Sequence, residues 1–436
     1  MNDPSQIKEK TVASTQRQVY RTLWRWHFYA GVFCIPFVIT LAISGAIFLF
    51  KPQFERWVDH PFNQLQVSEQ RATPNQIITT AQAAYPGSKF MAYHLPETPR
   101  HSVVVSVSAA GERIQVYVDP YRNQVLKSIP YADQFMQQVR SFHGELLAGR
   151  FGSVLVELAA CWALVLIVTG LYLWWPRSAK GMAGVLYPRL SKSGRVFWRD
   201  LHAVIGVWLS AFTLFLLVSG LPWALVWGAA FKEVRQWGAE PVVQDWTQTQ
   251  AQERASWRPS IVERIDLPEV VIAEAQALSL ASPVQISAAG DDFKVSSQTQ
   301  NRPQRADVWL NRTGEVVKAR DFADKSVVDR VVGVGIAAHE GYLFGWFNLI
   351  LGVVTTLGLV VLSVSGAVLW WRRRPSGKLG APAPIHTPRV GRVLVGLVLL
   401  LGVLLPVVGL SLIALVLLEF ILLRRWQTSR RWLGLA

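Results

Sequence analysis

The sequence predicts an α-helical integral membrane protein with about six transmembrane helices, an internal repeat and two small α+β domains outside the membrane. Three observations lead to this fold class. Of the 436 residues, 51% are hydrophobic and 19 are Trp, which is too apolar for an ordinary soluble enzyme. Several apolar runs approach the ~20 residues that a helix needs to cross a bilayer. Two long polar stretches separate those runs, and each has the composition of a folded domain.

Four apolar runs are expected to cross the membrane as single helices, at about residues 28–50, 154–175, 204–227 and 347–371. The first run ends at Lys51-Pro52 without a small-residue cleavage site, which indicates a retained span rather than a removed signal peptide. A fifth run, 393–423, is too long for one span and is interrupted by Pro406 and Gly409. We interpret it as a hairpin of two helices.

The cations are concentrated in four short segments, and this distribution predicts the topology. Residues 1–27, 176–201, 372–392 and 424–436 hold 21 of the 44 Lys and Arg residues but only three of the 29 Asp and Glu residues. The positive-inside rule places all four segments in the cytoplasm. The net charge of +15 therefore reflects topology and does not indicate a nucleic-acid partner.

This orientation predicts a multi-pass protein of the bacterial cytoplasmic (inner) membrane with both termini in the cytoplasm. The polar domains would lie outside, in the periplasm of a Gram-negative cell. The expected order is a cytoplasmic N-terminus 1–27, span 28–50, exported domain 51–142, histidine-bearing segment and span 143–175, cytoplasmic loop 176–201, span 202–227, exported domain 228–338, histidine-bearing segment and span 339–371, cytoplasmic loop 372–392, hairpin 393–423 and cytoplasmic C-terminus 424–436.

The two exported domains show the same predicted order of elements. The first reads as a helix at 74–84 and strands at 102–108, 113–118 and 125–128, with a turn at 119–123. The second reads as a helix at 268–277 and strands at 284–288, 293–297, 306–310 and 315–318, with a turn at 311–314. Both cysteines, Cys34 and Cys161, fall in apolar runs, so these domains contain no disulfide or cysteine metal centre.

Four histidines occupy repeated places in the two halves of the chain. Gly45 and Gly220 follow His27 and His202 by 18 residues, and Gly170 and Gly366 follow His143 and His339 by 27 residues. His27 and His202 belong to the cytoplasmic edge, and His143 and His339 belong to the outer side. Two facing pairs of this kind form the ligand set for two bis-histidine haems b. Bis-histidine ligation leaves no open position on iron and therefore suits electron transfer.

Other roles remain open for these histidines. His27 and His202 also fit interfacial side chains that merely reach toward water, although Gly31 and Gly206, four residues on, would clear room for a flat macrocycle. His143 and His339 also fit helix caps or contacts with the exported domains. Either their helices project outward, or breaks at Gly149-Arg-Phe-Gly152 and Gly345-Trp-Phe347 fold the histidines back over the bilayer. A divalent-metal site is disfavoured, because Glu145 and Glu340 are too few and differently spaced.

Charged and aromatic residues near the histidines have a functional and a structural interpretation. Arginines near each pair are candidate donors to haem propionates, or they serve topology alone. Glu157 lies within a predicted span, where it could pair with an outer arginine, relay protons or sit near the interface. The pairs Trp174-Trp175 and Trp370-Trp371 suit an interfacial belt and receive no redox role. The candidate arginines are Arg25 and Arg199 inside and Arg140 and Arg150 outside.

Several segments together resemble a known family. A helix followed by a small sheet that ends in Val116-Tyr-Val-Asp-Pro120, with a counterpart at Val308-Trp-Leu-Asn311, resembles the PepSY domain. The flanking helices resemble the PepSY-associated transmembrane family, in Arg25-Trp-His27-Phe-Tyr-Ala-Gly31, His143-Gly-Glu-Leu-Leu-Ala-Gly149, Thr169-Gly-Leu-Tyr-Leu-Trp-Trp175-Pro-Arg177, Arg199-Asp-Leu-His202, His339-Glu-Gly341, Ser365-Gly-Ala-Val-Leu-Trp-Trp371-Arg-Arg373, His386-Thr-Pro388 and Leu404-Leu-Pro406-Val-Val-Gly409. Members include iron-regulated membrane proteins and ferric-siderophore reductases that carry haem, so the resemblance implies haem, iron and a ferric siderophore here.

The expected function is therefore haem-dependent electron transfer across the membrane to a ferric siderophore or Fe(III) chelate. No nucleotide-binding or hydrolase motif is evident, so electrons must come from a separate cytoplasmic flavoprotein or from a membrane quinol. Membrane lipids are the other expected partner. Two alternatives stay open: a non-redox protein that binds or restrains an exported peptidase, and a permease for a chelate or metal. The permease is disfavoured because the spans hold few polar residues.

Overall fold

The structure is a computed structural model, and it describes residues 4–177, 181–236, 261–374 and 392–423, together with Ser376, Gly380 and Trp426. Most of the predicted cytoplasmic segments 372–392 and 424–436 lies outside the described residues, as do 178–180 and 237–260. The chain divides into two compact units. Unit 1 comprises Met1–Ala46, His143–Gly238 and Val353–Ala436, and unit 2 comprises Ile47–Phe142 and Ala239–Gly352.

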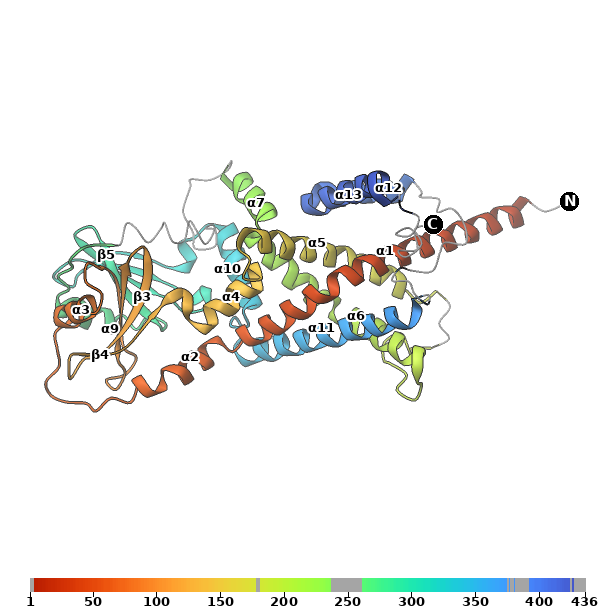
Figure 1. The fold of residues 1–436 in the computed structure, drawn as a ribbon. Coiled ribbons are helices and arrows are strands. Elements are labelled where there is room, and N and C mark those ends of the chain that lie inside the picture. Colours follow the sequence, from red (N-terminus) through yellow and green to blue (C-terminus); the bar gives the residue numbers. More distant parts are fainter. Residues whose placement is uncertain are drawn as a thin grey trace. The chain divides into compact units, whose positions relative to one another are not determined.

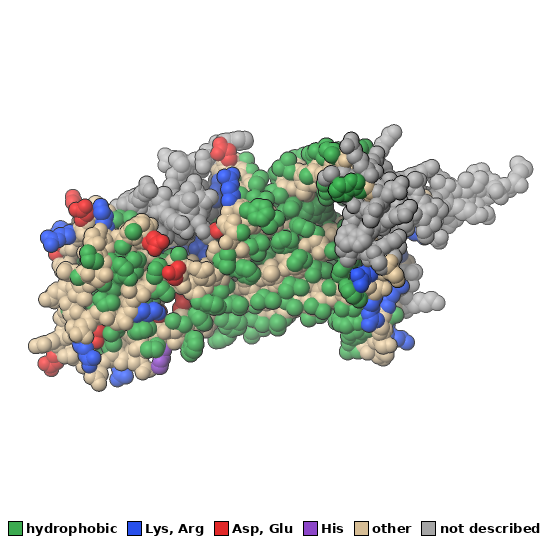
Figure 2. Space-filling view, viewed as in Figure 1, with side chains coloured by type: hydrophobic (Ala, Val, Ile, Leu, Met, Phe, Trp, Pro, Cys, Tyr) green, Lys and Arg blue, Asp and Glu red, His purple; other side chains and the backbone are tan. Residues whose placement is uncertain are grey.

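Unit 1 is built on long apolar helices. They are α1 (Pro4–Phe48), α5 (Gly149–Trp174), α6 (Gly194–Gly220) and α11 (Trp346–Arg373), and the first turns of α11 and the last residues of α1 belong to unit 2. Within the described residues, four helical segments are long and apolar enough to cross a membrane, at the places where four single spans were expected. Figure 1 shows these helices running alongside one another, and Figure 2 shows hydrophobic side chains covering their outer surface.

The fifth apolar run forms two short helices, α12 (Arg392–Leu404) and α13 (Pro406–Leu418). The break falls at Leu405, and Pro406 begins α13, where its missing backbone N–H costs nothing. Gly409 lies inside α13 and allows close packing: a Cβ there would lie 2.6 Å from the carbonyl oxygen of Gly402. Both helices are shorter than the spanning helices, so a total of six spans stays a prediction.

Unit 2 contains one antiparallel sheet of eight strands in the order β4-β3-β2-β1-β5-β6-β7-β8. Helices α3 (Pro74–Ala83) and α9 (Glu269–Ala277) pack against the core beneath this sheet (Figure 1). The strands are β1 (Lys89–His94), β2 (Val103–Ala109), β3 (Glu112–Asp119), β4 (Gln124–Pro130), β5 (Val284–Ala289), β6 (Asp292–Ser297), β7 (Asp307–Leu310) and β8 (Val316–Arg320).

The predicted pair of separate α+β domains is wrong in one respect, because the two sets of strands form a single sheet. Strand β1 of the first set pairs antiparallel with β5 of the second, with Tyr93 opposite Ile286 and His94 opposite Gln285. Ile77 of α3 and Val271 of α9 belong to the same core cluster. Burial of one apolar face against both helices therefore links the two halves of unit 2 into one hydrophobic core.

Local sequence explains most elements of unit 2. Alternate residues of β2, Val103 and Val105 among them, are fully buried, as a half-buried strand requires. Helix α3 begins with a capping box in which the Thr73 hydroxyl accepts the Gln76 N–H and the Gln76 side chain accepts the Thr73 N–H. The turn expected after β3 is confirmed, with the Asp119 carboxylate accepting the N–H of Tyr121 at 2.8 Å.

Candidate functional site

The structure brings together two of the four predicted histidines, His27 of α1 and His202 of α6. Their ring centroids are 6.4 Å apart and their planes meet at 83°. Metal–nitrogen bonds of about 2 Å on each side, and about 1 Å from nitrogen to ring centre, place two imidazoles on one metal atom with centroids about 6 Å apart. The observed separation therefore leaves room for one metal atom between the two rings.

Each ring of this pair is held from a neighbouring helix through Nδ1. The Nδ1 atom of His27 lies 2.9 Å from the Thr169 hydroxyl on α5. The Nδ1 atom of His202 lies 3.1 Å from the Leu362 carbonyl oxygen and 3.2 Å from the Ser365 hydroxyl, both on α11. In the part of the chain that the structure describes, no hydrogen bond uses Nε2 of either ring, so this atom is the one left to bind a ligand.

Two glycines lie directly against these rings. A Cβ on Gly170 would lie 3.2 Å from Cε1 of His27, and a Cβ on Gly366 would lie 3.3 Å from Cε1 of His202. The glycines first credited with making room, Gly31 and Gly206, instead face Leu166 and Leu362 respectively. Gly170 and Gly366 thus lie beside histidines, but each lies against a ring other than the one from which its spacing was counted.

A break precedes the span, as in the second geometry considered from sequence, but it lies at residues 146–148 rather than at Gly149–Gly152, which begins α5. The position of His143 over the bilayer stays a prediction. Helix α4 (Phe135–Glu145) ends before α5 begins, and the intervening Leu146 and Leu147 have φ values of 51° and 56°. Close packing at this break requires a glycine, because a Cβ on Gly152 would lie 1.6 Å from the carbonyl oxygen of Glu145. The break leaves Nδ1 of His143 2.9 Å from the Ser44 hydroxyl of α1.

Gly45 completes the surroundings of His143 in unit 1. A Cβ on Gly45 would lie 3.3 Å from Cε1 of His143, which repeats the arrangement at Gly170 and Gly366. His339 ends helix α10 (Val327–His339) in unit 2, where a similar break separates α10 from α11. A hydrogen bond spans that break: the side-chain N–H of Asn348 donates to the Ala338 carbonyl at 2.9 Å. The predicted pairing of His143 with His339 stays a prediction.

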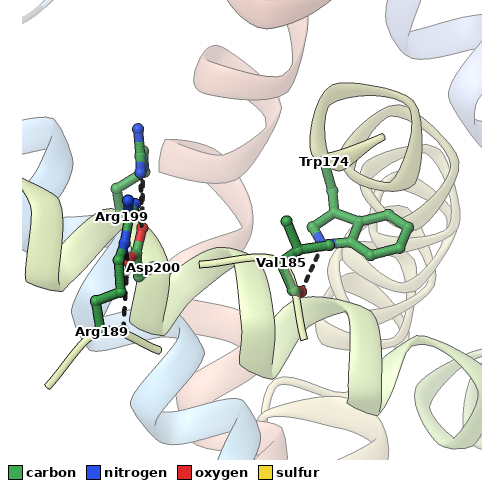
Figure 3. A network of polar contacts seen from close by, with 5 residues as sticks. All are labelled: Trp174, Val185, Arg189, Arg199 and Asp200. Carbon is green, nitrogen blue, oxygen red and sulfur yellow. Dashed lines mark hydrogen bonds and ion pairs between the residues drawn. The ribbon is translucent and has the colours of Figure 1, made fainter. Parts of the chain in front are cut away.

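The four arginines considered for haem propionates differ in their surroundings, and that role stays a prediction. Asp200, fully buried near the start of α6, accepts two side-chain bonds from Arg189, at 2.6 and 2.9 Å, and two from Arg199, at 2.8 and 3.2 Å (Figure 3). Arg199 is thus paired with a carboxylate two residues before His202. The guanidinium of Arg25 lies 5.8 Å from the ring centroid of Tyr29. Arg140 and Arg150 are exposed.

Trp174 and Trp208 fix the loop that carries Arg189. The indole N–H of Trp174 donates to the Val185 carbonyl at 3.0 Å (Figure 3), and that of Trp208 donates to the Leu186 carbonyl at 2.9 Å. Together with the Asp200 ion pairs, these bonds hold the loop between α5 and α6 against both helices.

Glu157 is buried in α5, with 2% of its surface exposed. Its carboxylate oxygens accept the backbone N–H groups of Val226 at 2.7 Å and Trp227 at 2.8 Å, at the start of helix α7 (Val226–Gln236). A carboxylate at a helix N-terminus satisfies free N–H groups and interacts favourably with the helix dipole. Glu157 is thus a capping residue for α7, and its predicted roles in pairing with an outer arginine or in proton relay stay predictions.

Sequence reasoning found the histidines but missed the hydroxyls beside them. Ser44, Thr169 and Ser365 each directly precede one of the repeated glycines, and this dipeptide was the signal available. Among the described residues, no group of three His, Cys, Asp or Glu is placed to hold a metal ion on its own. The protein can therefore supply two imidazole nitrogens as metal ligands, and the other ligands must come from a cofactor. In a haem, the macrocycle supplies those other ligands.

Comparison with known proteins identifies the family. No curated protein matches the chain. The family described as PepSY-associated TM region matches residues 24–373, which include all four repeated histidines and every strand of the sheet. The chain is therefore a member of the PepSY-associated transmembrane family.

Proposed function

We propose that the chain is a haem-binding electron-transfer protein that delivers electrons across the membrane to a ferric siderophore or another Fe(III) chelate. The observation that carries the proposal is the His27–His202 pair, with ring centroids 6.4 Å apart and each Nδ1 bonded to a neighbouring helix. Haem supplies a one-electron redox centre that imidazole side chains alone lack. His143 and His339 are the proposed ligands of a second, outer haem.

The chain's own residues would perform three tasks in this function. His27 and His202 would hold the haem iron through Nε2, and their Nδ1 bonds would keep the rings from rotating. Gly170 and Gly366 leave the flat rings unobstructed. The apolar helices around the pair exclude water and thereby favour electron passage over reaction with solvent.

The proposed reaction is one-electron reduction of the bound chelate, Fe(III) + e⁻ → Fe(II). Hard oxygen ligands hold Fe(II) less tightly than Fe(III), so release of iron follows the reduction. The electron donor is proposed to be a membrane quinol or a cytoplasmic flavoprotein. This activity would make the protein an oxidoreductase. Its proposed location is the inner membrane, with both termini in the cytoplasm.

The first test is an absorption spectrum of the detergent-purified protein, oxidised and then dithionite-reduced, with a pyridine haemochrome count per chain. We expect a low-spin b-type spectrum in the wild type and loss of about one haem per chain in His27→Ala or His202→Ala. His60→Ala, at an exposed histidine of unit 2, is the matched control and should retain the full spectrum. A colourless wild type expressed with ample haem would instead favour the peptidase-binding alternative.

The second test addresses the acceptor. A ferric chelate added outside proteoliposomes, with a quinol inside the bilayer, should be reduced by the wild type and not by His143→Ala or His339→Ala. Full reduction by either outer variant would contradict the proposed route.

A further inference from the structure

A five-residue pattern recurs wherever a histidine ring meets a neighbouring helix of unit 1. In the pattern, a leucine is followed after two residues by Ser or Thr and then by Gly. Three copies contact a described histidine: Leu41-Ala-Ile-Ser44-Gly45 at His143, Leu166-Ile-Val-Thr169-Gly170 at His27 and Leu362-Ser-Val-Ser365-Gly366 at His202. In each, the hydroxyl also bonds to the carbonyl of the leucine three residues earlier. A fourth copy, Leu216-Leu-Val-Ser219-Gly220, has the same bond within its helix, from the Ser219 hydroxyl to the Leu216 carbonyl at 3.2 Å.

Hydrogen-bond accounting fixes the direction of each contact. The Thr169 hydroxyl donates its single hydrogen to the Val165 carbonyl at 2.8 Å, and the Ser44 hydroxyl donates its hydrogen to the Thr40 carbonyl at 2.7 Å. With that hydrogen used, each hydroxyl can only accept from the histidine. With the hydroxyl hydrogens assigned in this way, His27 and His143 are the donors through Nδ1, and the lone pair is on Nε2.

The contact at His202 leads to the same result by an independent route. Its Nδ1 lies 3.1 Å from the Leu362 carbonyl oxygen, which has no hydrogen to donate. The Ser365 hydroxyl donates to that same carbonyl at 2.8 Å and accepts from Nδ1 at 3.2 Å. The imidazole must be the donor in both bonds, so His202 also has its proton on Nδ1.

We propose that Ser44, Thr169 and Ser365 are positioning residues that hold His143, His27 and His202 with Nδ1 protonated and Nε2 presented as the iron ligand. The following glycine of each pattern lets the ring approach the helix closely enough for this bond. The inference rests on the proposed function for the identity of the ligand, whereas the position of the proton follows from the hydrogen bonds alone. A bond from Nδ1–H to an acceptor raises the basicity of the opposite nitrogen and so favours the more highly charged metal.

Thr169 allows a matched set of substitutions. Thr169→Val keeps the shape and removes the acceptor, and Thr169→Ser restores the acceptor. Thr40→Val is the control, because Thr40 makes the same kind of helix bond, to the Phe37 carbonyl at 2.9 Å, with no histidine among its hydrogen-bond partners in the described chain.

We expect Thr169→Val to bind haem about tenfold more weakly than the wild type, with the loss falling chiefly on the ferric form. A tenfold preferential loss of the ferric form raises the midpoint potential by about 59 mV. Thr169→Ser should restore the wild-type potential, and Thr40→Val should leave it unchanged. An unshifted potential in Thr169→Val, or an equal shift in Thr40→Val, would overturn the positioning role.

A measurement without haem separates this inference from the proposed function. In haem-free full-length protein labelled with ¹⁵N-histidine, ring nitrogen chemical shifts report which nitrogen carries the proton. We expect the Nδ1–H form for His27, and a mixture of forms in Thr169→Val. An Nε2–H form of His27 in the wild type would refute the inference whether or not the protein binds haem, whereas a colourless protein with the Nδ1–H form would refute only the proposed function.

Discussion

His94 illustrates how burial and a nearby cation set the protonation of a histidine in the sheet of unit 2. It ends β1, where its Nε2 lies 2.9 Å from the Ser106 hydroxyl, and Arg113 donates to the same hydroxyl at 3.2 Å. Burial disfavours the charged imidazole, and the Arg113 guanidinium adds repulsion, which together lower the pKa of His94 to about 3. The residue is therefore neutral in the folded sheet at any pH near neutrality.

This depressed pKa predicts a pH dependence of stability. Between the ordinary pKa of 6.5 and the folded value of about 3, the unfolded state binds more protons than the folded state, so stability falls as the pH is lowered through that window. His94→Gln keeps a polar contact to Ser106 and removes the titration. We expect its melting temperature, followed by circular dichroism in detergent, to fall less than that of the wild type between pH 7 and pH 4. Parallel melting curves would contradict the prediction.

The glycines beside the histidines give a second prediction for single residues. An alanine methyl at position 170 would press on Cε1 of His27 at 3.2 Å, so Gly170→Ala should displace the ring and weaken haem binding. Gly31→Ala is the control: its methyl would lie 4.0 Å from Leu166, and alanine favours the helix by about 1 kcal/mol. The haem content per chain after purification distinguishes the two variants. Equal haem content in both would show that the His27 ring tolerates the alanine methyl at position 170.

For single residues, the sequence predicted the histidines and the repeated glycines but not the residues on other helices that they contact. The spacing of 18 and 27 residues marks positions within one helix or one half of the chain, whereas the contacts join different helices. His27 and Thr169 are 142 residues apart, and no periodicity along the chain relates them. The serine or threonine before each glycine also reads as an ordinary helix residue, because its hydroxyl bonds to its own helix.

Among the elements, α7 depends on a residue of another helix. Its first N–H groups, at Val226 and Trp227, are satisfied by the buried Glu157 carboxylate rather than by a local capping side chain. Trp227 also packs with Cys161 and Leu405 in an apolar cluster that joins α5, α7 and the α12–α13 hairpin. The carboxylate thus connects a helix of the bundle to the packing of the C-terminal hairpin.

Removing this carboxylate should loosen α7. We expect Glu157→Ala to cost about 1–3 kcal/mol, since two buried N–H groups lose their acceptors, and Glu157→Gln to cost less because one oxygen remains. Glu233→Gln, on the exposed part of α7, is the matched control. Limited proteolysis within 226–236 should accelerate in Glu157→Ala only. Unchanged cleavage would mean that packing of Trp227 alone holds the helix.

The elements that sequence patterns predicted are those with clear periodicity. The helix of α3 and the strands with alternating burial, such as β2, were found within a few residues of their ends. Strand β1 was missed because Phe90, Met91, Ala92 and Tyr93 are buried consecutively around a bulge, which hides the alternation typical of a strand. The breaks before α5 and α11 were considered but not decided, since glycine alone does not fix the direction of a turn.

For unit 2 as a whole, the decisive contact is the pairing of β1 with β5. It joins residues almost two hundred positions apart, and it turns the two predicted domains into one sheet. No sequence pattern in either half predicts the pairing of β1 with β5, because each half alone has the pattern of a complete small domain. A sheet edge left open at β1 would expose unpaired backbone groups, and β5 covers that edge.

A single sheet with a single core predicts that the two halves unfold together. Ile286 of β5 is fully buried opposite Tyr93 of β1, so Ile286→Ala should cost about 2–5 kcal/mol through lost burial and the cavity left behind. Val316→Ala, on the exposed edge strand β8, should change stability by less than about 0.5 kcal/mol. Hydrogen exchange of the full-length protein in detergent, read by mass spectrometry, resolves the two halves separately.

In Ile286→Ala, peptides from β2 and β3 should lose protection by the same free energy as peptides from β6 and β7, although the substitution lies only in the second half. Loss confined to β5 through β8 would show that the halves fold independently and that the β1–β5 pairing adds little. A shared loss would mean that the shared core couples the halves. A surface formed by both halves would then be disrupted by damage to either one, so a ligand that contacts one half would stabilise the other.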